Sequence, residues 1–303
     1  MFLSSQGSQI NLRSATNLAY VSLPLCHLHL HRTIVQLPNL HRDPSRLLVP
    51  SAMSSTPPAF PGRAIQPLAK RAQKSNDSIF IKYGTRHEVQ REVDTIFFIQ
   101  RNTSIPVPTV IESHVQESGS WFSMVLIPGL PLTDTWTRMS EEAQATTQRD
   151  LSNYLSELRA IHPPEPSYIG SCIGGSAYDH RLNNGLPCGP FTSVSEFHNV
   201  LVAPVARCPR PELAVSYRQQ LADDHEVIFT HADLCGDHIL VEPSTGKITG
   251  IVDWEMAGWW PAYWEYTKSL FGNRYMQWWK VLVGKVLDPY PSELRIERIL
   301  QQF

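Results

Sequence analysis

Three carboxylates and two histidines crowd into a short stretch in the last third of the chain. Residues 230–240 read THADLCGDHIL and residues 251–255 read IVDWE, which together contain His231, Asp233, Asp237, His238 and Asp253. Apolar runs typical of strands flank both segments. Carboxylates that are grouped beside buried strands repel one another unless they share a cation. The pattern therefore predicts a site that binds a cation and handles protons.

Oxygen ligands favour Mg²⁺, which in proteins usually takes one or two carboxylates and leaves its other positions to water and substrate phosphates. A remaining carboxylate is then free to accept a proton from a nucleophile. Zinc is the alternative ion, but Cys235 with His231 and His238 lacks the spacing of zinc ligands. A set of carboxylates that only cap turns would explain any one residue, but not all of them together.

The segments around these residues predict a strand followed by a hairpin. VIFT (227–230) is a strand that enters the loop HADLCGD, and the turn PSTGK joins HILVE to a third strand, ITGIVDWE. Pairing that begins next to this turn places position 253 opposite position 237 or 238. We therefore expect Asp253 to return beside Asp237 and His238, with Asp233 close by.

A second charged pair is predicted upstream. DSIFIKYG (77–84) indicates a strand that carries Lys82, and EVQREVDTIFFIQRN (88–102) indicates a helix. At 100° per residue, Glu92 falls inside the apolar stripe of that helix. A buried carboxylate needs a cation, and Lys82 is the nearest; an exposed Glu92 at the edge of the stripe is the alternative. The apolar residues of the stripe are Val89, Val93, Ile96, Phe97 and Ile99.

Between these regions, TSIPVPTVIES indicates an extended connection, and SWFSMVLIPG (120–129) indicates a strand that stops at Pro-Gly. Residues 140–161 have the periodicity of a long amphipathic helix. Six of the eight tryptophans follow residue 250, and we expect them to form core and rim of the C-terminal part rather than a substrate wall.

The sequence resembles the aminoglycoside phosphotransferase family of kinase-like small-molecule phosphotransferases, especially its fungal branch, from about Ser78 to the C-terminus. The resemblance implies an α+β, protein-kinase-like fold of two lobes: a small N-lobe sheet at residues 76–127 and a larger, mostly helical C-lobe at 128–303. ATP would lie in the cleft, with adenine against the backbone from Met124 to Ile127. The resemblance rests on blocks in one order: IKYG, NTSIPVP, VLIPGLPL, SELRAIHPP, CGPFTSVSEF, THAD, ILVEPSTGKITGIVDWE and WWPAYWEYTKSL.

By position, the resemblance implies a role for each charged residue. Lys82 would hold the α- and β-phosphates, and Glu92 would orient Lys82. Asp233 corresponds to the aspartate that accepts the proton of the substrate hydroxyl, and His231 would brace its loop. Asp253 corresponds to the metal-binding aspartate. The implied reaction moves the γ-phosphate of ATP to a hydroxyl of an unidentified small molecule with the help of Mg²⁺.

Three positions depart from the family pattern. His238 replaces an Asn that binds metal through its amide oxygen, and imidazole is a poor ligand for Mg²⁺. Three consequences are open: Asp237 could be the substitute ligand, the site could prefer Mn²⁺, or the second metal site could be lost. No glycine-rich loop precedes Lys82, so a truncated N-lobe is expected. Ala232 replaces a Gly, which is tolerated where the backbone does not need a positive φ. Two alternatives to an active enzyme therefore remain. One is a pseudokinase that acts as a nucleotide-binding or scaffold module, and the other is a gene product that does not fold as written.

Composition narrows the class of protein. A chain of 303 residues with 42% hydrophobic content can bury a sizeable core. Residues 1–75 hold eight Lys or Arg against one acid, a charge of +7, so residues 76–303 carry −9 and the whole chain has a net charge of −2. An acidic body of this kind is not expected to bind nucleic acid. The five scattered cysteines indicate a reducing compartment. No apolar run approaches the roughly 18 residues that span a bilayer, so no membrane insertion is expected.

We expect residues 1–75 to be a disordered leader or a misassigned extension, with Met53 as the start of a shorter protein. A mitochondrial transit peptide is the alternative, although the arginine spacing gives no clear amphipathic helix. The expected location is the cytoplasm. The acceptor molecule and the oligomeric state do not follow from the sequence.

Overall fold

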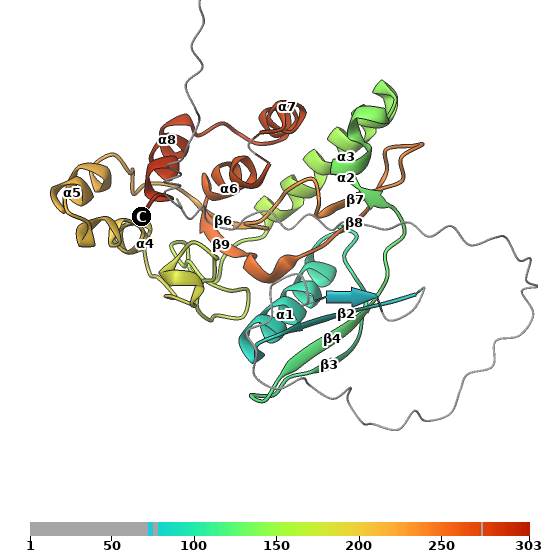
Figure 1. Ribbon diagram of the computed structural model, residues 1–303, viewed down its shortest axis with the longest axis horizontal. Coiled ribbons are helices and arrows are strands. Elements are labelled where there is room, and N and C mark those ends of the chain that lie inside the picture. Colours follow the sequence, from blue (N-terminus) through green and yellow to red (C-terminus); the bar gives the residue numbers. More distant parts are fainter. Residues whose placement is uncertain (1–71, 75–77, 274) are drawn as a thin grey trace, which may run out of the picture. The chain divides into compact units, whose positions relative to one another are not determined.

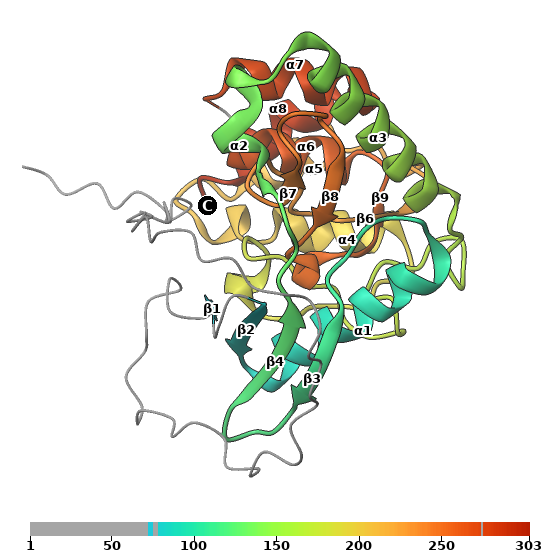
Figure 2. The same cartoon turned by 90° about the vertical axis from the view of Figure 1, so that its right-hand side faces the viewer.

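The computed structural model describes residues 72–74, 78–273 and 275–303. In this part of the chain a small sheet with one helix is followed by a larger, mostly helical part (Figure 1 and Figure 2). Most of the expected leader, with Met53, lies outside the described residues. Three of its last residues, Ala72–Lys74, form strand β1 and pair with the next strand.

The small sheet has the strand order β1-β2-β4-β3, and each neighbouring pair is antiparallel. Helix α1 covers one face of this sheet in Figure 1. Among the described residues, β1 is the one strand that precedes the Lys82 strand. The elements are β1 (Ala72–Lys74), β2 (Ile79–Gly84), α1 (Arg86–Asn102), β3 (Val110–His114) and β4 (Ser120–Val125).

Three details of this lobe differ from the expectation. The segment expected to be only an extended connection contains strand β3. Pro106 and Pro108 argue against a strand in this segment, but β3 begins just after them. Phe97 is 37% exposed, whereas the other four apolar residues of the α1 stripe are buried, so Phe97 was wrongly placed in the core. Thr85 caps α1 together with Glu88 in a capping box, which starts the helix slightly earlier than its periodicity indicates.

The larger lobe contains two small sheets, β5-β7-β8 and β6-β9, within a set of helices. The expected helix at 140–161 is α3, and the expected strand at 227–230 is β6. Short 3-10 helices lie at Trp136–Arg138, Asn183–Gly185, Val205–Arg207 and Trp254–Met256. The strands and α-helices of this lobe are β5 (Leu130–Pro131), α2 (Leu132–Thr135), α3 (Glu141–Ala160), α4 (Val194–Val202), α5 (Glu212–Arg218), β6 (Val227–Thr230), β7 (Ile239–Val241), β8 (Ile248–Ile251), β9 (Gly258–Pro261), α6 (Trp264–Gly272), α7 (Gln277–Val286) and α8 (Pro291–Leu300).

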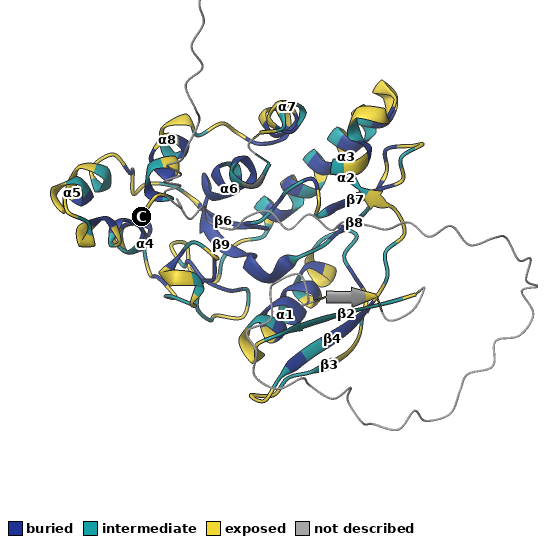
Figure 3. Ribbon diagram, in the orientation of Figure 1, coloured by how far each residue is buried: buried dark blue, intermediate teal, exposed yellow. Residues whose placement is uncertain are grey.

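The core of the larger lobe lies where β6 and β9 meet the helices. Figure 3 shows these strands buried, while α5 is partly exposed. The expectation that the late tryptophans form core is confirmed for Trp254, Trp259, Trp260, Trp264 and Trp279, all of which are buried. This rigid packing supports the loop between β6 and β7 and the segment after β8. No described helix combines the length and the apolar character needed to cross a membrane.

Candidate active site

The hairpin β7–β8 brings the acidic residues together in the expected register. Ile239 pairs with Ile251, and the N–H of Val252 donates to the carbonyl of His238 at 3.0 Å. Position 253 therefore lies opposite position 237, as predicted. The expected third strand is shorter than predicted, because β8 ends at Ile251 and a 3-10 helix begins at Trp254. Asp253, between them, has a left-handed backbone with φ of 69°.

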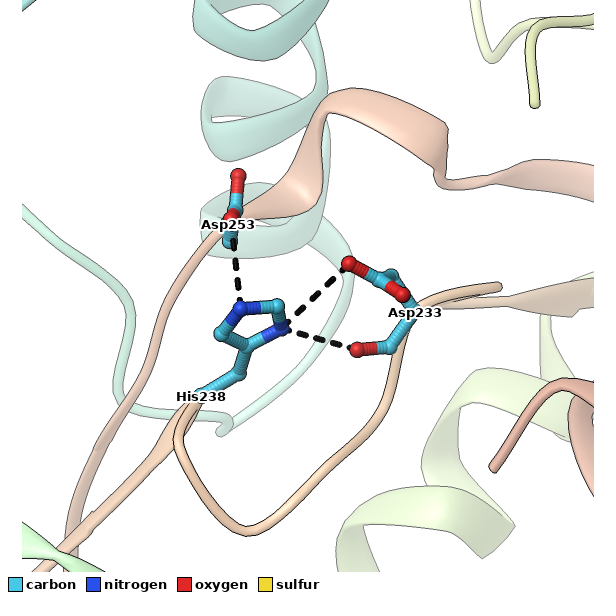
Figure 4. A group of neighbouring side chains, drawn as sticks. All are labelled: Asp233, His238 and Asp253. Atoms are coloured by element: carbon cyan, nitrogen blue, oxygen red, sulfur yellow. Dashed lines mark hydrogen bonds and ion pairs between the residues drawn. The ribbon is translucent and has the colours of Figure 1, made fainter. Parts of the chain in front are cut away.

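His238 stands between the two aspartates in Figure 4. Its Nε2 lies 3.2 Å from Asp253 Oδ2, and its Nδ1 lies 2.8 Å from the carbonyl oxygen of Asp233 and 3.6 Å from Asp233 Oδ2. Because carboxylate and carbonyl oxygens only accept, both ring nitrogens carry hydrogen in this arrangement. Burial opposes the charged ring, but Cys235 and the two aspartates hold the pKa of His238 well above its ordinary value. His238 is therefore an imidazolium that bridges the two carboxylates.

The two aspartates differ in their protonation. Burial raises the pKa of Asp233 to about 6, although His238 and Lys268 act in the opposite direction. Burial also acts on Asp253, but there Lys82 and His238 prevail and hold its pKa well below the usual range. One carboxylate thus stays ionised while the other titrates near neutral pH, which is the separation that acid–base chemistry needs.

Lys82 on β2 is held by three carboxylates. Its Nζ lies 2.5 Å from Asp253 Oδ1, 2.7 Å from Glu92 Oε2 and 3.1 Å from Glu255 Oε2. Glu92 is 3% exposed, so the prediction of a buried carboxylate paired with Lys82 is confirmed and the solvent alternative is wrong. Burial raises the pKa of Glu92 to about 7, with the other two carboxylates adding to the effect of burial.

Glu255 and its neighbour His180 were not predicted. Glu255 Oε1 lies 3.0 Å from His180 Nε2, which comes from the long connection between α3 and α4. A signal for Glu255 was present, because residues two apart on an extended segment share a face and Glu255 follows Asp253 by two. His180 gave no such signal, since its connection has no periodicity.

Two groups of described side chains are close enough to share a metal ion. In the group formed by Glu92, Asp253 and Glu255, the ammonium of Lys82 already contacts all three carboxylates. The group formed by Asp233, His238 and Asp253 is therefore the better candidate. Asp237 is exposed and belongs to neither group.

Hydrogen bonds from His231 and Glu265 hold the loop that carries Asp233. His231 Nε2 donates to the carbonyl of Val252 at 3.0 Å, and His231 Nδ1 accepts from the N–H of Asp233 at 3.2 Å. Both bonds require a neutral ring, and burial lowers the pKa of His231 to about 3. The buried Glu265 on α6 accepts from the N–H of His231 at 2.6 Å and of Ala232 at 3.3 Å. His231 thus links the backbone of Asp233 to the segment after β8.

Ala232 corrects an expectation about the backbone. Its φ is 62°, a left-handed conformation that favours glycine, so the exchange of Gly for Ala does not mean that a positive φ is unnecessary here. The conformation costs roughly 1–2 kcal/mol for an L-residue. The surrounding hydrogen bonds to Glu265 hold the loop in it.

Met124 and Ile127 lie at the connection between the lobes. Met124 is buried in β4, where it pairs with Phe80 on one side and Val110 on the other. Ile127 lies past the end of β4, and its side chain sits over Gly250, where a Cβ would be 2.5 Å from Ile127 Cδ1. The contact of this segment with adenine stays a prediction.

Known proteins resemble this chain over most of the described region. A family model described as the Phosphotransferase enzyme family matches residues 80–288. The aminoglycoside 3'-phosphotransferase of Streptomyces fradiae is 20% identical over 166 residues, which are 55% of this chain and 58% of the relative. That of Streptomyces ribosidificus is 22% identical over 162 residues, or 54% and 57% of the two chains. The match thus spans little more than half the length of these curated relatives.

Solved structures share the fold. The streptomycin–ATP–APH(2")-IIa ternary complex has a TM-score of 0.50 and 15% identity, with 75% of each chain covered. A putative fructosamine-3-kinase from Haemophilus somnus 129PT has a TM-score of 0.50 and 14% identity, with 74% of this chain and 73% of that chain covered. The α+β, kinase-like fold of two lobes is therefore confirmed. Because the family model matches well over half of the residues, the chain belongs to the Phosphotransferase enzyme family.

Proposed function

We propose that the protein is an ATP-dependent phosphotransferase that moves the γ-phosphate to a hydroxyl of a small molecule. The observation that carries this proposal is the contact of Lys82 with both Glu92 and Asp253, at 2.7 and 2.5 Å. A lysine fixed by a buried glutamate beside an ionised aspartate is the arrangement that phosphoryl transfer by kinase-like enzymes uses.

The protein's own residues divide the work. Lys82 would hold the nucleotide phosphates, and Glu92 would keep its ammonium pointed toward them. Asp233, with a third of its side chain exposed, would accept the proton of the acceptor hydroxyl, since its pKa of about 6 leaves it ionised at neutral pH. The neutral His231 would keep the Asp233 loop in place through its two hydrogen bonds. Positioning and electrostatics supply most of the catalysis in this reaction class.

The donor set fits Mg²⁺ in part. Asp253 offers a carboxylate oxygen that is ionised across the working pH range, and Asp233 lies within the same group. When bound, the ion would neutralise the charge that develops on the transferred phosphoryl group. His238 fits less well, because an imidazolium donates where a ligand must accept. A preference for Mn²⁺ would follow if the neutral imidazole acts as a ligand.

The bridge made by His238 supports a second candidate, a pseudokinase. An imidazolium between Asp233 and Asp253 gives both carboxylates a partner and so removes much of their need for a metal ion. In that case the protein would bind nucleotide weakly or without metal, and turnover would be absent. The two candidates make opposite predictions for metal-dependent ATP binding.

Thermal unfolding of the full chain separates the two candidates, because binding does not require the unknown acceptor. We expect ATP with Mg²⁺ or Mn²⁺ at about 100 times its dissociation constant to stabilise the protein by roughly 2.7 kcal/mol, a shift of several degrees. Lys82→Ala and Asp253→Asn should abolish the shift, while Lys285→Ala, on the exposed face of α7, should retain it. A well-folded protein without any shift would refute the phosphotransferase and favour a scaffold.

A further inference from the structure

Glu255 is a second buried acid on Lys82 to which the proposed reaction gives no role. An ammonium group has three N–H donors, and in this structure three carboxylates surround it. In a complex with ATP and metal at least one donor must turn to a phosphate. Asp253 is the carboxylate that we expect to leave Lys82, because it is the metal candidate and its other oxygen already has a partner in His238.

Two anchors then remain on the lysine, and they come from different lobes. Glu92 is on α1 of the small lobe, and Glu255 is on the 3-10 helix that follows Asp253 in the larger lobe. The side chain of Glu255 is mostly buried and has little contact with solvent. Its two oxygens are divided, with Oε2 on Lys82 and Oε1 on His180.

Contacts of His180 and of the two residues that flank it fix the position of its side chain. The hydroxyl of Tyr178 lies 3.2 Å from His180 Nδ1. The flanking residues are anchored in the larger lobe, because Asp179 Oδ2 pairs with Lys268 Nζ at 2.7 Å and Arg181 pairs with Glu297 at 2.7 Å. The imidazole therefore meets Glu255 from a fixed direction.

The same segment also contacts the helix that carries Glu92. The guanidinium of Arg91 donates to the carbonyl of Ser176 and lies 5.7 Å from the centre of the Tyr178 ring. Arg91 is buried and adjacent to Glu92. Residues 176–181 thus connect α1 to the Glu255 side of Lys82, so that both carboxylate anchors are tied to one segment.

We infer that Glu255, oriented by His180, is a positioning residue that keeps Lys82 directed at the nucleotide phosphates when Asp253 binds metal. This inference rests on the proposed function. Glu255 acts through Lys82 and His180 acts through Glu255, so neither is expected to touch the nucleotide. The competing explanation is an ion pair that only stabilises the contact between the lobes.

Calorimetric titration of the full chain with two ligands distinguishes these explanations. ATP with Mg²⁺ reports on the phosphate contacts of Lys82, whereas adenosine lacks phosphates and reports on the rest of the cleft. We expect Glu255→Gln and Glu92→Gln each to weaken ATP binding about tenfold and to leave adenosine binding unchanged. His180→Gln should weaken ATP binding less, and the double variant should be no weaker than Glu255→Gln alone. Glu112→Gln, an exposed change of the same charge on β3, is the matched control.

Each other outcome overturns the inference in a recognisable way. Unchanged ATP binding in Glu255→Gln, with a loss in Glu92→Gln, would leave the proposed function intact and remove the role of Glu255. An equal loss for ATP and adenosine would show a purely structural ion pair. Wild-type protein that binds no ATP with Mg²⁺ would refute the proposed function itself. If Glu255→Gln does not fold, His180→Gln decides by the same comparison, because the His180 side chain is 37% exposed and its exchange disturbs less of the core.

Discussion

The imidazole of His238 binds the carboxylate of Asp253 across the end of the β7–β8 hairpin, with Nε2 3.2 Å from Oδ2. The other oxygen of Asp253 is 2.5 Å from the ammonium of Lys82. Both oxygens of the candidate metal ligand are therefore engaged by cations of the protein. A metal ion at Asp253 competes with both cations, and the displacement of either one costs binding free energy.

Exchange of His238 for asparagine should remove this competition. Asparagine offers an uncharged amide oxygen, which is a suitable ligand for Mg²⁺, in place of a cation. We expect His238→Asn to lower the Mg²⁺ concentration for half-maximal ATP binding by about tenfold and to reduce any preference for Mn²⁺. The measurement is a metal titration at fixed ATP, followed by calorimetry or thermal unfolding.

The neighbouring Asp237 is the matched control for this change. It is exposed and lies outside both groups of potential metal ligands, so Asp237→Asn should leave the metal titration unchanged. A loss of metal dependence in Asp237→Asn would instead make Asp237 the substitute ligand. An unaltered titration in His238→Asn would contradict the competition between imidazolium and metal.

Asp233 should give the transfer reaction a lower pH limit. Its folded-state pKa of about 6 means that the carboxylate becomes protonated below that pH and can no longer accept the hydroxyl proton. With ATP kept saturating at each pH, we expect the rate to fall about tenfold per pH unit below about pH 6. Initial rates with the first acceptor hydroxyl identified, or with water as acceptor, provide the profile.

Asp233→Asn tests the same role without a change of pH. An amide keeps the size of the side chain but does not accept the proton, so the rate should fall by roughly 10²–10⁴ with little effect on ATP affinity. Retention of most of the activity in this variant would exclude Asp233 as the base. A pH limit that survives in Asp233→Asn would have to come from another group.

The Lys82–Glu92 pair and the hairpin register could be predicted because both follow from local periodicity. A carboxylate inside the apolar stripe of a helix requires a cation, and the strand just before that helix supplies one. Likewise, a short turn fixes the register of a hairpin, which places position 253 opposite position 237 or 238 without any knowledge of the rest of the fold, and the structure selects 237.

The residues that the sequence did not reveal act across long separations. His180 lies in an irregular connection, and Glu265 on α6 reaches back to the backbone of His231 and Ala232. Neither pattern nor spacing predicts such contacts, because they depend on how helices pack in three dimensions. The left-handed conformation of Ala232 escaped prediction for a similar reason, since an alanine gives no local sign of a positive φ.

The backbone of Ala232 makes a specific prediction about stability. Exchange of Ala232 for glycine would relieve the strain of the left-handed backbone, which stabilises the fold. The exchange would also remove a buried methyl group and increase the entropy of the unfolded chain, and both of these effects destabilise the fold. These effects nearly cancel, so we expect Ala232→Gly to change the free energy of unfolding by less than about 1 kcal/mol. Ala143→Gly, at a buried position of α3 with helical backbone, should cost about 2 kcal/mol. Equal costs at both sites in denaturant unfolding would argue against the strain at Ala232.

Glu265 should make stability depend on pH near neutrality. Burial raises its pKa to about 7, although the N–H groups of His231 and Ala232 oppose this effect. Between about pH 4.5 and pH 7 the folded protein therefore keeps a proton that the unfolded chain has lost. The stabilisation from Glu265 is complete below the unfolded pKa and is lost as the pH rises through 7, at up to about 1.4 kcal/mol per pH unit.

Glu265→Gln isolates this contribution, because its amide oxygen can still accept from both N–H groups but cannot titrate. We expect the free energy of unfolding of the wild type, minus that of the variant, to decrease from pH 5 to pH 7 in denaturant titrations. Glu112→Gln, which changes an exposed carboxylate on β3, is the matched control. A difference that increased with pH would mean that Glu265 is ionised in the folded state. Its charge would then strengthen the two hydrogen bonds that hold the Asp233 loop, and the loop would be most rigid where Asp233 is deprotonated.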